Sequence, residues 1–72
     1  MKPIPYREVR RKLIAAGFAE RGTHGSHVKF YKKTTEGTLT VIVPKHSSEV
    51  PPGTIRSLLR QAMISENIFM DL

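Results

Sequence analysis

Between His27 and Lys33 the sequence alternates between apolar and polar side chains with a period of two. Val28 and Phe30 fall on one side of such a segment. The side chains on the other side are His27, Lys29, Tyr31 and Lys33. This period is typical of a β-strand that buries one face and exposes the other. The segment therefore predicts a sheet that is covered on one side only, with His27 and Lys29 together on its open side.

The flanking segments predict the strands that pair with this one. Residues 18–21 form a short candidate strand, and residues 22–25 hold two glycines that can make a tight reversal. Residues 35–38 predict a hairpin loop because Gly37 can take a positive φ, and the β-branched residues 39–43 predict the return strand. The three strands then form an antiparallel meander.

Apolar residues at helical spacing predict one helix before this meander and one after it. The first covers residues 6–16; it follows Pro5, which lacks the N–H that a first helical turn leaves unpaired, and it ends at Gly17. The second begins with Thr54 as its N-cap and turns four apolar side chains inward. These four are Ile55, Leu58, Leu59 and Ala62.

A further helical turn is expected at residues 65–67, with Ile68 and Phe69 docking it on the core. The order is therefore helix, three strands, helix. Connections this short place both helices on one face of the sheet and leave the other face open. This α-β-β-β-α arrangement belongs to the α+β class, and residues 1–72 are expected to form a single domain.

The chain has 72 residues and no cysteine, so disulfides and thiolate metal sites cannot supplement a small core. No apolar run approaches the roughly 18 residues of a membrane span. The first residues lack the apolar region of a secretory signal. The cytoplasm is the expected compartment.

The charge is strongly positive and unevenly spread. Twelve Lys and Arg stand against six Asp and Glu, a net charge of +6, which favours a polyanionic partner such as nucleic acid. Residues 1–46 hold ten of these cations. A basic helix face is commonly just solvated, but together with the strand lysines it favours phosphate contact. The cations predicted to contact RNA are Arg7, Arg10, Arg11, Lys29, Lys32 and Lys33.

The candidate proton-transfer groups are the three histidines, His24, His27 and His46. Imidazole has an unperturbed pKa of about 6.5, so it both accepts and donates a proton near neutrality. The RNA 2′-hydroxyl attacks the adjacent phosphate when a base removes its proton and a cation stabilises the phosphoryl oxygens. His27 beside Lys29 fits this chemistry, although a lone strand histidine is more often a plain surface residue. No metal site is predicted, because the histidines lack neighbouring ligands to complete a set.

Residues 25–30, Gly-Ser-His-Val-Lys-Phe, resemble the Gly-Ser-His-x-x-aromatic signature of the HicA (YcfA-like) toxin family. Three other segments are similar to family segments: residues 5–18, which end in Ala-Gly-Phe; residues 43–46, Val-Pro-Lys-His; and residues 52–62, which hold Gly-Thr and Gln-Ala. They follow the family's order and cover nearly the whole chain. One departure is Phe30, near which relatives can carry Tyr.

This resemblance implies a fold similar to the double-stranded RNA-binding domain and the activity of a ribosome-independent mRNA interferase. It also implies a HicB antitoxin that is encoded alongside the toxin and neutralises it. The family's catalytic histidine corresponds to His27, and His46 matches a recurrent family position.

The resulting prediction is a type II toxin–antitoxin toxin that cleaves mRNA with His27 as general acid/base and needs no metal or other cofactor. Lys29 is expected to stabilise charge at the phosphate, and Gly25 and Ser26 to shape the turn that presents His27. Because transphosphorylation normally uses two proton-transfer groups, either His24, His46 or water assists, or turnover is slow.

The expected partners are mRNA and a HicB-like antitoxin, without a membrane and without direct DNA recognition. Two alternatives stay open. One is a non-catalytic module that binds double-stranded RNA by shape and phosphate contacts. The other is an interaction protein whose basic face docks an acidic partner.

Overall fold

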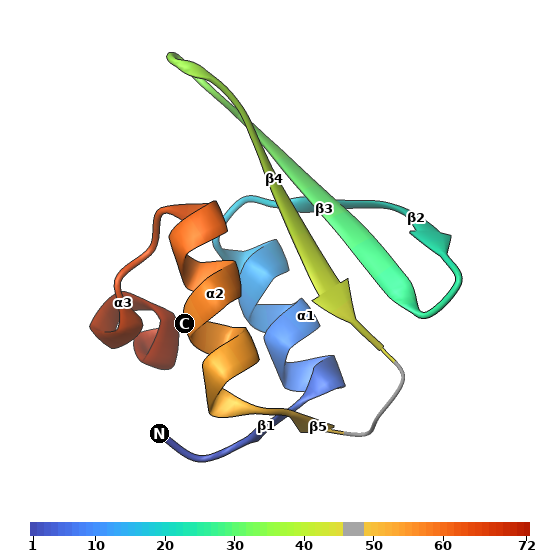
Figure 1. Ribbon diagram of the computed structural model, residues 1–72. Coiled ribbons are helices and arrows are strands. Elements are labelled where there is room, and N and C mark those ends of the chain that lie inside the picture. The colour runs from blue at the N-terminus through green and yellow to red at the C-terminus, as the bar shows by residue number, and fades with distance from the viewer. Residues whose placement is uncertain (46–48) are drawn as a thin grey trace.

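The helices and strands follow the predicted α-β-β-β-α order (Figure 1). The computed structural model describes residues 1–45 and 49–72. Its helices are α1 (Tyr6–Ala15), α2 (Pro52–Ala62) and α3 (Glu66–Asp71). Its strands are β1 (Ile4–Pro5), β2 (Ala19–His24), β3 (His27–Thr34), β4 (Gly37–Pro44) and β5 (Glu49–Val50). The α+β class is confirmed.

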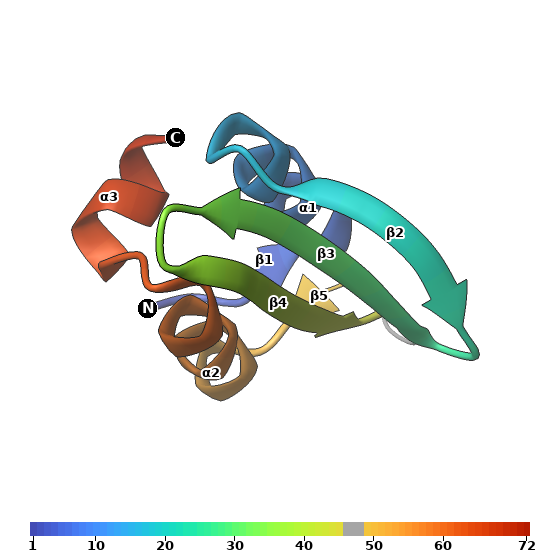
Figure 2. The same ribbon diagram turned by 90° about the horizontal axis from the view of Figure 1, so that it is seen from above.

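The main sheet is antiparallel with the strand order β2-β3-β4. Helices α1 and α2 lie on the same side of it (Figures 1 and 2). The two buried cross-strand pairs of β3 and β4 are Val28 with Val43 and Phe30 with Val41. The alternation predicted for residues 27–33 is therefore confirmed, and the face turned away from the helices is open to solvent.

Apolar side chains of both long helices close the core over this buried face. Val9 and Leu13 of α1 and Ile55 and Leu58 of α2 are buried, at the three- and four-residue spacing of an amphipathic helix. Burying one such side chain contributes about 1.5–3 kcal/mol. The two helices thus cover one face of the sheet, and the other face is accessible to other molecules.

The reversal between β2 and β3 is shorter than the sequence predicts. Residues 22–25 were expected to turn, but β2 continues to His24, and only Gly25 and Ser26 form the turn. Gly25 has φ 64°, as the first central residue of a type II′ hairpin turn requires. The chain accommodates the other glycine, Gly22 with φ 87°, as part of a bulge.

This bulge shifts the register of β2 against β3. Glu20 pairs with Phe30, whereas Thr23 pairs with Val28, so two residues of β2 face Lys29 alone. A glycine with positive φ lets β2 carry the extra residue while pairing resumes on both sides of it. The two-residue turn at Gly25 and Ser26 places His24 in direct register with His27, and the bulge changes only the pairing of the residues before Thr23.

Helix α2 begins at Pro52, three residues before the start that a cap at Thr54 predicts. Pro51 precedes it without a side-chain cap, and Thr54 lies inside the first turn, so the prediction of Thr54 as N-cap is wrong. The physical reason is that a proline in the first turn has no N–H to satisfy. The helix ends at Met63, which takes the left-handed conformation with φ 57°.

Helix α3 is N-capped by Ser65, whose hydroxyl oxygen accepts a hydrogen bond from the N–H of Ile68 at 3.2 Å. This start agrees with the prediction. Phe69 is fully buried, but Ile68 is 60% exposed. Neighbouring residues on a helix point about 100° apart, so a single short helix turns only one of the two toward the core.

A second, two-stranded sheet was not predicted. Strand β1 pairs antiparallel with β5, with Ile4 opposite Val50 and Pro5 opposite Glu49. Strands of two residues are too short to show a period in the sequence. The pairing buries Ile4 and Val50 and fixes the entry into α1 beside the entry into α2.

Candidate functional site

His27 is the first residue of β3 and is exposed on the open face of the sheet. Val28 follows it and is fully buried, which anchors the strand immediately beside the histidine. The carbonyl of Ser26 accepts a hydrogen bond of 2.6 Å from the N–H of Lys45, just beyond β4. The turn that carries His27 is therefore held from both sides, by the core and by the neighbouring strand.

The strand register places His27 beside one residue on each neighbouring strand. His24 of β2 and Pro44 of β4 are its direct cross-strand partners. Directly opposed residues point to the same face, with Cβ atoms about 5 Å apart. Sequence reasoning placed His24 in a loop; the structure brings it next to His27, with both side chains exposed.

The open face is cationic. Lys29 and Lys33 of β3 lie on it, and Arg21 joins them from β2. The residues of β4 on this face carry no charge: Thr38, Thr40, Ile42 and Pro44. Among the described residues the face holds no carboxylate, because Glu20 points to the helix side, where it pairs with Arg10.

Two shallow clefts flank Tyr31 in the middle of this face. The smaller, of about 200 Å³, is lined by Arg21, His24, Lys29 and Tyr31 among others. The larger, of about 450 Å³, includes Arg21, Tyr31 and Lys33 among others, and Lys32 borders it where its side chain runs beside Gly17. Sequence reasoning did not select Arg21 or Tyr31, although both fall on the same strand face as the residues it did select.

The predicted arginines of α1 lie in the helix layer, across the sheet from His27 (Figure 1). Nε of Arg10 lies 2.7 Å from a carboxylate oxygen of Glu20. Arg11 donates to Glu8 at 3.0 Å, and this hydrogen bond holds the pKa of Glu8 below its ordinary value. Arg7 is exposed on the same helix. The six predicted cations therefore do not form one surface.

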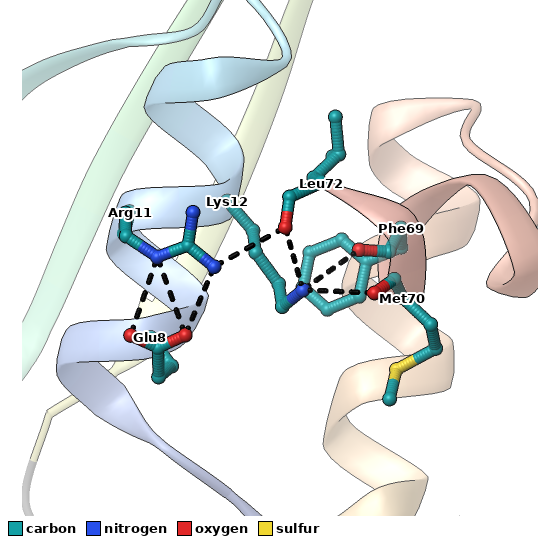
Figure 3. Close-up of polar contacts among 6 residues, drawn as sticks. All are labelled: Glu8, Arg11, Lys12, Phe69, Met70 and Leu72. Atoms are coloured by element: carbon teal, nitrogen blue, oxygen red, sulfur yellow. Dashed lines mark hydrogen bonds and ion pairs between the residues drawn. The ribbon is translucent and has the colours of Figure 1, made fainter.

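Lys12, also on α1, is buried and joins α1 to α3 (Figure 3). Its Nζ donates to the carbonyl oxygens of Phe69, Met70 and Leu72 at 3.2, 3.2 and 3.0 Å. The ammonium also lies 5.6 Å from the centre of the Phe69 ring. A cation at the carboxyl end of a helix is favourable, because the last carbonyls have no partners within the helix.

Lys32 is separated from the rest of β3's cations by the alternation of the strand. It lies on the side of Phe30, where its Nζ donates to the carbonyl of Ala16 at 2.8 Å and lies 5.8 Å from the Phe18 ring centre. The Lys32 ammonium thus provides a donor for a carbonyl at the carboxyl end of α1, where the last carbonyls have no partners within the helix. The period of two that placed Lys29 on the open face could have shown that Lys32 lies on the other.

His46 lies outside the described residues. Within residues 1–45 and 49–72 there is no group of three or more His, Cys, Asp or Glu that could hold a metal ion. The described helices are all too short or too polar to cross a membrane.

The fold and this face define a small α+β protein that presents a cationic, solvent-exposed sheet surface with two histidines at one end. Residues 6–64 match the family model described as the HicA toxin of bacterial toxin-antitoxin systems. The chain therefore belongs to the HicA toxin family, as the resemblance at residues 25–30 indicated, and a toxin of such a system has an antitoxin as its partner. A search of curated proteins finds no match.

Proposed function

We propose that this toxin is a ribosome-independent mRNA interferase whose general acid/base is His27 and whose inhibitor is a HicB-type antitoxin. The observation that carries the proposal is the position of His27, exposed at the start of β3 with Lys29 two residues along the same carboxylate-free face. Such a face attracts the RNA backbone, and it brings a proton-transfer group and a cation to one phosphate.

In the proposed reaction the imidazole of His27 accepts the proton of a ribose 2′-hydroxyl. The 2′-oxygen attacks the adjacent phosphorus, and the bond from phosphorus to the 5′-oxygen of the next nucleotide breaks. The products are a 2′,3′-cyclic phosphate and a 5′-hydroxyl. Lys29 stabilises the charge that develops on the phosphoryl oxygens.

The leaving 5′-oxygen needs a proton, and His24 is the best-supported donor. It stands opposite His27 across the hairpin, so one phosphate can reach both rings. His46 and water are the other two candidate donors. Gly25 and Ser26 act as positioning residues, because the two-residue turn they form sets the His24–His27 pair.

The antitoxin is proposed to bind over the same open face and so keep RNA from His27. The whole chain acts as a single domain in the cytoplasm, and phosphates approaching the helix side meet Arg7 first, since Arg10 and Arg11 already pair with carboxylates.

The test compares the wild type with His27→Ala. The wild type is expected to arrest growth on expression and to cleave RNA in the presence of a chelator, leaving cyclic phosphate ends. His27→Ala should lose both activities, at least about 100-fold in rate, while its circular dichroism and Tm stay unchanged. Replacing the scissile ribose by 2′-deoxyribose should block cleavage by the wild type.

Growth arrest by a folded His27→Ala variant would contradict the catalytic assignment. RNA binding by the wild type without any cleavage would favour the non-catalytic module that binds double-stranded RNA. The variant His24→Gln separates the proton donors: a slower rate with unchanged RNA affinity supports His24, and an unchanged rate assigns the role to His46 or water.

A further inference from the structure

Tyr31 occupies the centre of the open face, on the middle strand of the sheet. Its direct cross-strand neighbours are Ala19 and Thr40, both small. The tyrosine is only partly buried and borders both clefts of the face. An aromatic ring with short neighbours and open space on two sides is a platform on which another flat group can stack.

The cations around this ring have no role in holding the fold. Arg21 lines both clefts, Lys29 lines the one toward His27, and Lys33 lines the other. Within residues 1–45 and 49–72 none of the three makes an ion pair or a side-chain hydrogen bond, in contrast to Arg10 across the sheet. Their charges are available to an anion.

We propose that Tyr31, with Arg21, Lys29 and Lys33, forms a binding site for a single-stranded RNA segment, with one base stacked on the tyrosine and the backbone following the cations. This site deepens the proposed function, on which it rests, by specifying how the substrate is held. Base stacking on an aromatic ring combined with a positive groove is the usual way in which single strands are bound.

The geometry connects this site to His27. The two residues are four positions apart on β3, which corresponds to about 13 Å along the strand. The cleft bordered by His24 and Lys29 lies between them. A phosphate at the histidine pair and a base at Tyr31 can thus belong to one short stretch of RNA.

The stacking platform selects unpaired RNA. In a duplex the faces of the bases are covered by their neighbours, so a tyrosine on a flat sheet cannot reach them. In a single strand the bases separate and each exposes a π-face. The site therefore discriminates against the double-stranded RNA that the fold class alone would suggest.

The test uses the intact protein and a 2′-O-methyl oligonucleotide, which cannot undergo the proposed cleavage. Fluorescence anisotropy measures its Kd, and 2-aminopurine in the strand reports stacking. Tyr31→Leu is expected to weaken binding by about tenfold or more and to abolish the 2-aminopurine signal, whereas Tyr31→Phe keeps both. Tyr6→Leu, the same change at the other tyrosine of the chain, is the matched control and should bind like the wild type.

The cations are tested by salt dependence. Arg21→Gln and Lys33→Gln should each lower the slope of log Kd against log salt by about one phosphate contact, with Tm unchanged. Equal Kd values for Tyr31→Leu and Tyr31→Phe, or equal affinity of the wild type for duplex and single strand, overturn the site. Weaker antitoxin binding with unchanged RNA binding in Tyr31→Leu also overturns it and makes Tyr31 part of a protein interface.

Failure of this site and failure of the proposed function give different results. Binding to the 2′-O-methyl strand does not depend on catalysis. If the wild type cleaves RNA and Tyr31→Leu binds the strand normally, the stacking site is wrong and the proposed nuclease activity stands. If the wild type binds the strand through Tyr31 but does not cleave RNA, the stacking site stands and the proposed nuclease activity is wrong.

Discussion

The two sides of the sheet use their cations in opposite ways. In the helix layer Arg10, Arg11, Lys12 and Lys32 each donate to an oxygen atom of the protein itself. On the open face Arg21, Lys29 and Lys33 have no such oxygen partner within residues 1–45 and 49–72. The chain's net charge of +6 is therefore not a measure of the charge on its open face.

This difference follows from what surrounds each charge. Cations beside helix ends and carboxylates find acceptors at the carboxyl ends of α1 and α3 and on Glu8 and Glu20. A cation over an uncovered sheet finds only paired backbone and neutral side chains. The face of the sheet on which a lysine lies therefore decides whether its ammonium is bound to the protein itself or is free to contact another molecule. The presence of the lysine in a basic stretch of sequence does not decide this.

The largest expected effect comes from two lysines three positions apart on β3. Lys29→Met should lower kcat/KM for RNA about 100-fold without changing Tm, because it removes the cation nearest the reacting phosphate and leaves the fold's own contacts intact. Lys32→Met should lower the activity far less, because Lys32 borders only the cleft farther from His27, and it should lower the stability by about 1 kcal/mol, because it removes the donor to the Ala16 carbonyl. Cleavage assays and urea unfolding of both variants measure the contrast. The opposite pattern would break the comparison.

A second test removes the buried cation of the helix layer. Lys12→Met retains the aliphatic packing but leaves three carbonyls of the α3 end without their donor, and we expect a loss of about 2 kcal/mol in the free energy of unfolding. Urea unfolding followed by circular dichroism gives the value. Lys33→Met on the open face is the control, with no loss expected. Equal stability of the two variants would contradict a structural role for Lys12.

The smallest effect concerns the exposed pair Glu8–Arg11. The pKa of Glu8 is lowered, so the pair stabilises the fold above the ordinary carboxyl pKa of 4.5, and this contribution is lost as the pH falls through the lowered value. Glu8→Gln should thus lower Tm slightly at pH 7 and not at all at pH 2. A difference in Tm that grows toward low pH would show that the pair does not act in this way.

The sequence predicts the parts of the fold that depend on local periodicity. The alternation around Val28 and Phe30 is enough to place His27 and Lys29 on an open face, and the spacing of Ile55 and Leu58 is enough to orient α2. These patterns succeed because burial on one side imposes a fixed period on a strand or a helix.

The features that the sequence does not predict depend on partners distant in the chain or on a single extra residue. Lys12 meets carbonyls 57 to 60 residues away, which no local pattern records. Strands β1 and β5 lie far apart in the chain and pair with each other. The bulge between Glu20 and Thr23 decides which residues of β2 lie opposite Phe30 and Tyr31, and a glycine alone does not tell a bulge from a turn.

The bulge in β2 also affects whether copies of this toxin associate with one another at high concentration. Strand β2 forms an outer edge of the main sheet, and all six of its residues are exposed. A flat edge strand would invite a second molecule to extend the sheet, which is the first step toward fibres. An additional residue bends and twists the edge, and Arg21 adds a charge there, so neighbouring copies meet a surface that is poorly matched to β-pairing. The bulge at Gly22 thus discourages self-association of the toxin.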